Sequence, residues 1–297
     1  MARPLTIEQR DSRLGVWLIA PSVLVFLCLI AYPLVDSVWM SFRQINTITL
    51  DGHYVGLRNY EEIISSPDFW RSLINNFIWT AGALTLQVVA GIAIGLMLHQ
   101  NVWCRSLARG LILFPYLLPM VVAVLVWKWL FNDLYGLLNA ALVHSGLVDF
   151  PVDWLGGMPS AMISIIIVGA WKYFPFVVLT VLARLQSIPE QLYEAAKIDG
   201  AGPLARFVDI TLPQLRGVLV IVVLLRAIWD FKEFDLIYMM TGGGPVISTQ
   251  TLPLLVFKHA FPLQQLGKGA AVAVIMMLIM LVFMLGYLRL YGREQDK

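Results

Sequence analysis

The residues best suited to chemistry are charged side chains that interrupt long apolar runs. Lys172 stands between Trp171 and Tyr173 deep in one run, and Asp230 and Glu233 fall in or at the end of another. A charge at the centre of a membrane span costs roughly 2.5–3.5 kcal/mol on insertion scales, so Lys172 is not expected to face lipid. We expect it to face an internal cavity or a partner helix, beside the aromatic rings that flank it.

Neighbouring aromatic and charged residues leave two interpretations open. Trp127 and Trp129 offer more aromatic surface one apolar run earlier, but their place near its outer end is also typical of an interfacial aromatic belt. Arg226 and Asp230 have the i, i+4 spacing of an ion pair on one helix face. The sequence does not separate a salt-bridged gate from a ligand contact at Asp230 and Glu233.

Signatures of catalysis are absent from the 297 residues. No G-x-x-x-x-G-K-[ST] phosphate loop occurs, so the chain is not expected to bind ATP by that mechanism. The four histidines lack H-x-x-x-H spacing, and no G-x-S-x-G nucleophile elbow is present. Cys28 lies in an apolar run and Cys104 in a basic loop, which predicts neither a disulfide nor a metal site. This chain is not expected to be an enzyme.

The elements that must position these residues are membrane helices. Hydrophobic residues make up 59% of the chain and charged residues 13%, which no soluble globular class matches. A span needs roughly 20 apolar helical residues. We predict an all-α integral membrane fold with six transmembrane helices, which are approximately Leu14–Trp39, Asn76–Leu98, Gly110–Phe131, Ala161–Ala183, Val218–Tyr238 and Ala270–Leu290. Between the first two, Gly56–Tyr60 is expected to be a short structured lateral element.

The basic residues predict the orientation of these helices. With both termini in the cytoplasm, that side collects 12 Lys and Arg residues and the outer side seven. The first apolar run has 22 residues from Leu14 to Val35, too long for a cleaved signal peptide core, so it is expected to be a retained span. The predicted parts are a cytoplasmic segment (1–13), a transmembrane domain (14–291) and a cytoplasmic tail (292–297). The net charge of +2 gives no indication of nucleic-acid binding.

One polar segment, Ser187–Pro213, separates the fourth and fifth predicted spans on the cytoplasmic side. It is expected to form two short helices. Ser187 and Glu190 have the spacing of a capping box for the first, Gly200 would end it, and Pro203 suits the first turn of the second. The segment is therefore a compact knob that can dock into a partner.

The hairpin carries a recognisable motif, which resembles the EAA loop of permease subunits of ATP-binding cassette importers. In that family the loop is a coupling helix seated in a cleft of the ATPase subunit. Small alanines would allow close backbone approach, the glutamate would offer a charge-assisted hydrogen bond, and the glycine would permit the tight reversal. The matching residues are Glu194, Ala195, Ala196, Asp199 and Gly200, followed by Ile210, Leu212 and Pro213.

A second similarity narrows the class. Phe231–Tyr238, followed by Thr241–Pro245, resembles the end of the fifth span in carbohydrate permeases, the group that includes maltose and glycerol phosphate importers. Pro119–Asn139 is similar to their third span and following loop. The resemblance covers about residues 14–291, and the T-x-G-G-P ending is that of the first of two different permease subunits. Maltose-type subunits can carry extra N-terminal spans and a large outer insertion, which are lacking here.

The resemblance implies the type I importer permease fold, located in the bacterial cytoplasmic (inner) membrane. A second homologous permease, two ATPases carrying ATP and Mg, and an extracytoplasmic substrate-binding protein would complete the importer. It also implies a cavity bounded by the third, fourth and fifth spans, where aromatic faces stack on sugar rings and charged groups bind hydroxyls. The pathway residues expected from this are Trp127, Trp129, Trp171, Lys172, Tyr173, Asp230 and Glu233.

The expected cargo is a sugar or sugar derivative, which the sequence does not identify. Lys172 raises the alternative of an anionic cargo, a phosphorylated or sulfonated sugar or polyol. An ion-coupled secondary transporter would more often show an inverted repeat or broken helices with an ion site, and the sequence reveals neither. A membrane enzyme would need polar groups converging from several spans.

Overall fold

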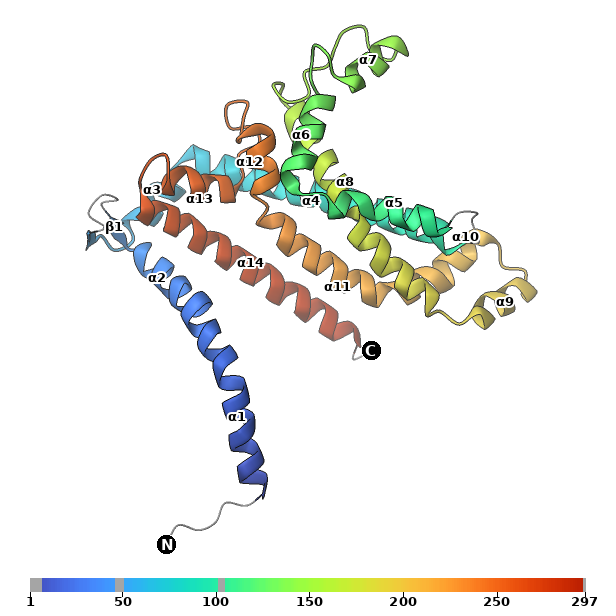
Figure 1. Ribbon diagram of the computed structural model, residues 1–297, viewed down its shortest axis with the longest axis horizontal. Coiled ribbons are helices and arrows are strands. Elements are labelled where there is room, and N and C mark those ends of the chain that lie inside the picture. Colours follow the sequence, from blue (N-terminus) through green and yellow to red (C-terminus); the bar gives the residue numbers. More distant parts are fainter. Residues whose placement is uncertain (1–6, 46–50, 101–104, 296–297) are drawn as a thin grey trace. The chain divides into compact units, whose positions relative to one another are not determined.

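The computed structural model, drawn in Figure 1, describes residues 7–45, 51–100 and 105–295. The described chain divides into two compact units. The first combines Met1–Ser65 with Val256–Met276, and the second combines Ser66–Leu255 with Met277–Lys297. Cys104, for which no disulfide is predicted, lies outside the described residues, as do the ends of the two predicted terminal segments.

The N-terminal helix of the first unit is long and apolar. It comprises α1 (Ile7–Phe26), a π-helical turn (Leu27–Ala31) and α2 (Tyr32–Met40). The part Gly15–Met40 is long and apolar enough to cross a membrane, and its most apolar window has no residue buried within the chain. A helix of this kind needs lipid or another protein around it, which agrees with the predicted first span.

A short polar element follows this span. It consists of two antiparallel strands and a helix, which are β1 (Arg43–Ile45), β2 (Gly52–Tyr54) and α3 (Arg58–Ile64). The side-chain amide of Asn59 donates to the carbonyl oxygens of Ser41 at 2.8 Å and Arg43 at 3.0 Å, which fixes α3 against the end of α2. The structured element predicted at Gly56–Tyr60 is confirmed, although the all-α prediction did not include the strands.

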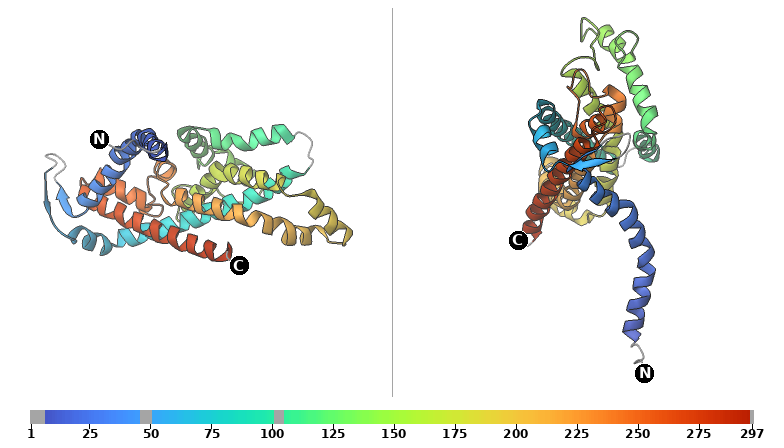
Figure 2. Two further views of the ribbon diagram at one scale, coloured as in Figure 1. Left: turned by 90° about the horizontal axis from the view of Figure 1, so that it is seen from below. Right: turned by 90° about the vertical axis from the view of Figure 1, so that its left-hand side faces the viewer.

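The second unit is built on two long helices, α4 (Pro67–His99) and α8 (Ser160–Gln186), which lie side by side in Figures 1 and 2. Glycines let the two backbones approach closely, since a Cβ on Gly95 would lie 2.8 Å from Cγ1 of Val181. Small residues at such contacts are typical of membrane bundles, where lipid provides no hydrophobic drive between helices. The predicted second and fourth spans fall within these helices. A buried core cluster of this unit includes Trp79, Ile165, Val168 and Leu236.

The predicted third span, Gly110–Phe131, is broken in two. Its parts are α5 (Arg105–Leu117) and α6 (Met120–Leu130), which are bent by 96° relative to each other. Figure 1 shows α6 turning away from the direction of α5. Pro119, at the N-cap of α6, has no N–H to continue the preceding helix. The proline therefore ends one helix and starts another, where the sequence pattern indicated a single apolar run.

The predicted fifth span, Val218–Tyr238, is displaced toward the N-terminus. The helical run with sufficient length and hydropathy is Pro203–Phe231, most of which is α11 (Leu212–Phe231). Side chains of Asn76 and Trp79 on α4 donate to the carbonyl oxygens of the last two residues of α11, at 3.1 and 2.8 Å. They replace the helical N–H donors that the end of α11 lacks, and the helix stops there.

The glycine-rich run Thr241–Pro245, predicted to stop the fifth helix, instead ends a separate short helix. Gly242 caps that helix with φ of +62°, the left-handed conformation that suits glycine. The remaining elements are α7 (Leu137–His144), α9 (Glu190–Ile198), α10 (Pro203–Arg206), a π-helical turn (Phe207–Thr211), α12 (Asp235–Thr241), α13 (Leu252–Ala260) and α14 (Leu266–Gln295). In the described residues five helices could cross a membrane, or six if the bent α5–α6 pair is one span.

Candidate translocation and coupling sites

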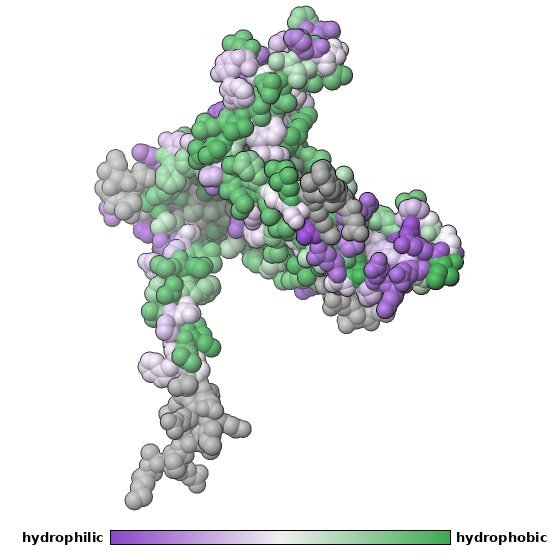
Figure 3. Space-filling view, turned by 45° about the vertical axis from the view of Figure 1, so that its right-hand side comes forward, coloured by the Kyte–Doolittle hydropathy of each residue, from purple (hydrophilic) through white to green (hydrophobic). Residues whose placement is uncertain are grey.

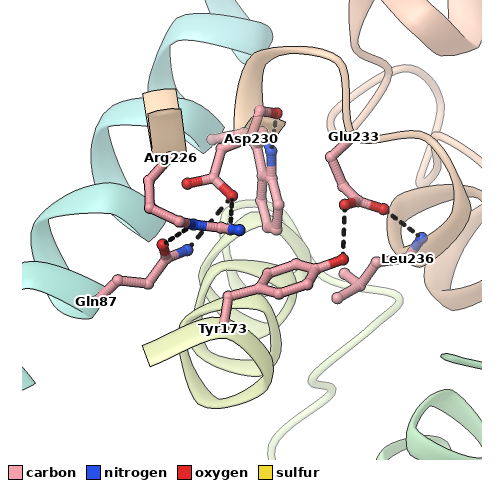
Figure 4. A network of polar contacts seen from close by, with 7 residues as sticks. Gln87, Tyr173, Arg226, Asp230, Glu233 and Leu236 are labelled. Atoms are coloured by element: carbon pink, nitrogen blue, oxygen red, sulfur yellow. Dashed lines mark hydrogen bonds and ion pairs between the residues drawn. The ribbon is translucent and has the colours of Figure 1, made fainter. Parts of the chain in front are cut away.

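A buried polar network in the second unit joins α4, α8 and α11 (Figure 4). Arg226 and Asp230 form the ion pair predicted from their spacing, and their side chains are 2% and 0% exposed. Gln87 closes the network, because its Oε1 accepts from Arg226 Nε at 2.8 Å and its Nε2 donates to Asp230 Oδ1 at 3.4 Å. A buried ion pair is tolerated when further hydrogen bonds compensate its desolvation, and Gln87 provides them.

Tyr173 extends this network toward the gap between α11 and α12. The Arg226 guanidinium lies 4.3 Å from the centroid of the Tyr173 ring and 5.5 Å from that of Trp229, within cation–π range. The Tyr173 hydroxyl donates to Glu233 Oε2 at 2.9 Å, and Glu233 Oε1 accepts from the Leu236 N–H at 3.0 Å. Glu233 thus accepts from an N–H of the first turn of α12 and joins this helix to Tyr173 on α8.

These side chains border a hollow of about 350 Å³. Two of its lining charges are positive and two are negative, so the lining has no net charge. Aromatic faces beside both donors and acceptors suit a polar ligand with apolar ring faces. The residues that line the hollow are Tyr116, Tyr173, Arg226, Trp229, Lys232, Glu233, Phe234 and Asp235.

Lys172 is directed away from this hollow, toward the bend in the third apolar run. Its ammonium donates to the carbonyl oxygens of Pro115 at 2.8 Å, Tyr116 at 3.2 Å and Leu118. The break at Pro119 deprives this stretch of helical N–H donors, and Lys172 supplies three replacements. Of the two expected surroundings, the structure shows the partner helix.

The polar hairpin between α8 and α11 consists of α9 and α10, and Gly200 makes the reversal between them. Gly200 has φ of +80°, which L side chains rarely adopt. Its N–H donates to the Lys197 carbonyl at 3.1 Å, and the Ala201 N–H donates to that of Ala196 at 2.8 Å. These two bonds form a Schellman motif, the helix ending for which glycine is best suited.

The hairpin exposes both polar and apolar side chains. Glu194, Ala195, Asp199 and Gly200 are exposed, while Ala196 is partly buried. The end of the second unit that carries α9 and α10 shows a concentration of hydrophilic surface in Figure 3. Two apolar side chains of this segment nevertheless face outward, since Ile198 is 86% and Leu204 75% exposed. Large apolar side chains exposed among polar ones are a feature of protein and membrane interaction sites.

Comparison with known proteins decides the family. Residues 87–294, which are more than half of the chain, match the model of the binding-protein-dependent transport system inner membrane component. The chain belongs to this family. It is therefore a permease subunit, a multi-pass protein of the inner membrane, and the recognition made from the hairpin motif is confirmed.

Several named relatives match the permease over nearly its whole length. The trehalose/maltose transport system permease protein MalF of Thermococcus litoralis is 36% identical, covering 98% of this chain and 97% of its own. The sulfoquinovosyl glycerol transport system permease protein SmoG of Agrobacterium fabrum is 34% identical, covering 96% of this chain and 92% of its own. The inner membrane ABC transporter permease protein YcjO of Escherichia coli is 33% identical, with 93% of each chain covered.

A solved structure supports the fold. A bacterial ABC transporter that imports the acidic polysaccharide alginate matches with a TM-score of 0.84 and 20% identity, covering 96% of each chain. At this identity the likeness concerns the fold alone. The permease thus has the type I importer architecture that the sequence predicts.

The predicted pathway residues separate into three groups. Tyr173 and Glu233 line the hollow. Trp127 and Trp171 lie outside its lining, where their rings meet edge to face with centroids 5.4 Å apart, and Trp129 is 54% exposed. The remaining two, Lys172 and Asp230, are buried, and both are bonded to groups within the protein.

The capping box predicted at Ser187 and Glu190 is wrong. The Ser187 hydroxyl instead donates to the Arg184 carbonyl at 2.8 Å, and Pro189 occupies the N-cap of α9 without a side-chain bond. Ser187 is the C-cap of α8, and its hydroxyl and its backbone N–H both donate to the Arg184 carbonyl at the end of that helix. Ser187 and Glu190 have the spacing of a capping box, but the sequence pattern did not reveal that Ser187 belongs to the end of α8.

Sequence reasoning also missed residues that hold the sites in place. Arg184 bonds Gln214 through the backbone carbonyl at 2.9 Å and the side-chain Oε1 at 2.7 Å, which links the two ends of the hairpin. Gln87 is a polar residue within an apolar run, and the argument applied to Lys172 would have identified it. No group of three or more His, Cys, Asp and Glu side chains in the described residues could hold a metal ion.

Proposed function

We propose that this permease forms one half of the translocation path of an ATP-driven importer for a sugar or sugar derivative. A second homologous permease would form the other half, two separate ATPases would bind ATP and Mg, and an extracytoplasmic binding protein would deliver the cargo. The proposed topology has both termini in the cytoplasm. Relatives named for trehalose/maltose and sulfoquinovosyl glycerol support a carbohydrate cargo.

The observation that carries the proposal is the exposed hairpin of α9 and α10. Glu194, Ala195 and Gly200 are exposed together with the apolar Ile198 and Leu204, so the segment is suited to insertion into a partner. The partner we propose is the ATPase, because the chain has no phosphate loop of its own. ATP-driven closure of two ATPases would bring the two coupling hairpins together.

The hairpin is connected to the hollow through two helices. Arg184 and Tyr173 lie on α8, and Gln214 and Arg226 lie on α11. Because the Arg184–Gln214 bonds join α8 and α11 at the base of the hairpin, a displacement there would move both helices. These helices carry Tyr173, Arg226 and Trp229, so the shape of the hollow would change with the nucleotide state. Such differential contact in two states is what coupling requires.

The hollow has the chemistry expected for a carbohydrate. Tyr116, Trp229 and Phe234 offer ring faces, while Lys232 and Glu233 offer a donor and an acceptor for hydroxyl groups. We propose that this surface contacts the cargo and that Trp127, Trp129 and Trp171 support or flank the path.

An anionic cargo is the alternative, supported by the relative named for sulfoquinovosyl glycerol. Lys172 gives this alternative no support, because its ammonium is bonded to three carbonyl oxygens. The cation that would serve it is Lys232, which is exposed and lines the hollow.

Purification and reconstitution test the proposal. The permease should co-purify with a Walker-motif ATPase, and the reconstituted complex should hydrolyse ATP faster when its binding protein carries a glycoside. A panel of neutral and sulfonated glycosides would separate the two cargo classes. Transport by this chain alone, driven by an ion gradient, would refute the importer and indicate a secondary transporter.

A further inference from the structure

A polar hollow in the first unit lies outside the proposed path. It has a volume of about 290 Å³ and lies between β1, α3 and the segment 264–268. Three cations, Arg43, Arg58 and Lys268, line it together with one carboxylate, Glu62. The lining therefore carries a formal charge of +2, from three positive charges and one negative charge. A cavity with this charge attracts an anion.

Glu62 holds two of the cations in place without neutralising the site. Its Oε1 accepts from Arg58 Nε at 2.8 Å, and its Oε2 accepts from Lys268 Nζ at 2.7 Å. The described contacts use one donor of each cation, whereas a guanidinium carries five donors and an ammonium three. Arg43 is likewise held, since its Nη2 donates to the Gly52 carbonyl at 2.6 Å. The cations are thus positioned for a further acceptor.

The walls of the hollow are fixed to one another by contacts to backbone carbonyl oxygens. Asn59 bonds the carbonyl oxygens of Ser41 and Arg43, which joins α3 to β1. Gly267 lies directly against the Arg43 carbonyl, and a Cβ added at Gly267 would overlap that oxygen. The start of α14 is therefore locked to β1. Preformed walls reduce the entropy lost when a ligand binds.

Two residues that line the hollow, Arg43 and Lys268, lie close to the ends of candidate membrane spans, which indicates the depth of the hollow in the membrane. The first candidate span is Gly15–Met40 and ends three residues before Arg43. The last candidate span is Leu266–Arg289 and begins two residues before Lys268. Both spans thus leave the hydrocarbon at this hollow, which places its cations at the level of lipid headgroups.

We propose that this hollow binds the phosphodiester headgroup of an anionic phospholipid. The phosphate oxygens accept charge-assisted hydrogen bonds, and arginine and lysine side chains are the donors that recognise them best. Basic pockets between membrane helices bind lipid headgroups in this way. Soluble inorganic phosphate offers the same acceptor chemistry, but the headgroup is present at high local concentration at this depth. The lipid would link the polar element after the first span to the last span.

Native mass spectrometry of the purified transporter complex tests this proposal. The complex is incubated in detergent with phosphatidylglycerol or with zwitterionic phosphatidylcholine, and bound lipid is counted with and without added inorganic phosphate. We expect retention of phosphatidylglycerol over phosphatidylcholine. Lys268→Gln and Arg43→Gln should each weaken phosphatidylglycerol retention about tenfold, the effect of losing one charge-assisted hydrogen bond. Arg71→Gln is the matched control, because Arg71 is exposed and does not line the hollow.

Two results would overturn the proposal. Equal retention of phosphatidylglycerol by the wild type, Lys268→Gln and Arg43→Gln would show that the lipid binds elsewhere. Displacement of the bound species by inorganic phosphate, with no preference between the two lipids, would show a site for a soluble anion instead. Arg43→Gln serves as the second variant because it leaves the Glu62–Lys268 ion pair in place if Lys268→Gln fails to fold.

Discussion

Lys172 shows that a charge inside a membrane protein can serve the backbone rather than the cargo. Its three acceptors are carbonyl oxygens at the α5–α6 bend, so the side chain replaces hydrogen bonds that a proline break removes. The bend in turn positions Tyr116, which lines the hollow. Loss of the ammonium would leave three carbonyl oxygens without these donors in an apolar surrounding.

We therefore expect Lys172→Met to impair uptake of neutral and anionic cargo alike. The variant should also destabilise the permease by about 1.5–3 kcal/mol, the range for hydrogen bonds to a charged group. Uptake assays and thermal unfolding in detergent measure both effects. Lys232→Met is the matched control, because Lys232 is exposed at the hollow and should affect cargo binding without lowering the unfolding temperature. Normal uptake of a neutral sugar by Lys172→Met would contradict this assignment.

Glu62 lies outside the candidate membrane spans, and its ionisation is expected to make the stability of the folded permease depend on pH. Hydrogen bonds from Lys268 and then Arg58 lower the pKa of Glu62 from its ordinary value of 4.5. A carboxylate with a lowered pKa stabilises the folded state fully above the unfolded value and loses this contribution as pH falls through the folded value. The stability difference between wild type and Glu62→Gln should thus be constant from pH 7 to about 5.5 and shrink below about 4.5. Thermal unfolding across this range measures it, and a difference that grows toward low pH would contradict the prediction.

At the scale of helices, the sequence predicts what composition and periodicity determine. The spans within α4 and α8 follow from apolar length, and the reversal at Gly200 follows from the conformations that glycine permits. The early end of α11 depends on partners that are distant in sequence, and the broken α5–α6 segment takes its replacement donors from Lys172, 57 residues after Pro115. Asn76 and Trp79, for example, satisfy carbonyl oxygens about 150 residues away, and no local pattern reveals such a contact.

In the candidate site, too, the sequence revealed local pairs but no contacts between distant residues. The sequence identified the Arg226–Asp230 pair because i, i+4 spacing is a local property of a helix. It could not assign Gln87 to that pair or direct Lys172 toward the α5 carbonyl oxygens, because both depend on how helices pack. The motif of the α9–α10 hairpin was recognisable because its residues lie close together in the sequence.

The contact between α4 and α8 leads to a prediction about packing. A Cβ on Gly91 would overlap the Val177 side chain, so Gly91→Ala should force the helices apart and cost about 1–3 kcal/mol, as overpacked cores do. Gly110→Ala is the control, because nothing lies within 4 Å of a Cβ there. Thermal unfolding of the two variants in detergent compares them, and equal unfolding temperatures would argue against close α4–α8 packing.

Two glycines of the α9–α10 hairpin give a second test at the scale of helices. Gly200→Val places a β-branched residue at φ of +80° and should disturb the end of α9, with a cost of at least about 1–2 kcal/mol for the left-handed conformation. Gly202→Val provides the comparison, because Gly202 has an ordinary φ of −68° and open space around it. ATP-driven uptake should fall strongly in the first variant and little in the second. Similar uptake in both would show that the reversal is not needed for coupling.

For the whole transporter, the proposed function requires that movements of a separate ATPase are transmitted to the membrane helices of this permease. In the proposed function, the exposed α9–α10 hairpin and its hydrogen-bonded base would connect an ATPase surface to α8 and α11. A change on the exposed face of α9 should therefore affect coupling while the spans remain folded. Substitutions on the exposed face of α9 should therefore change the coupling of ATP hydrolysis to uptake, whereas substitutions between the packed helices should change the stability of the fold.

Glu194 and Glu190 allow this separation to be tested, since both are exposed glutamates on α9. Glu194→Gln removes the charge that, under the proposed function, the motif presents to an ATPase, and loss of a charge-assisted hydrogen bond predicts roughly tenfold weaker docking. Glu190→Gln removes the same charge outside the motif and should leave docking within about twofold, as expected for an exposed surface charge. Co-purification of the ATPase and the ratio of sugar imported to ATP hydrolysed measure the effect. Equal behaviour of both variants, with unchanged unfolding temperatures, would mean that the ATPase binds this permease elsewhere.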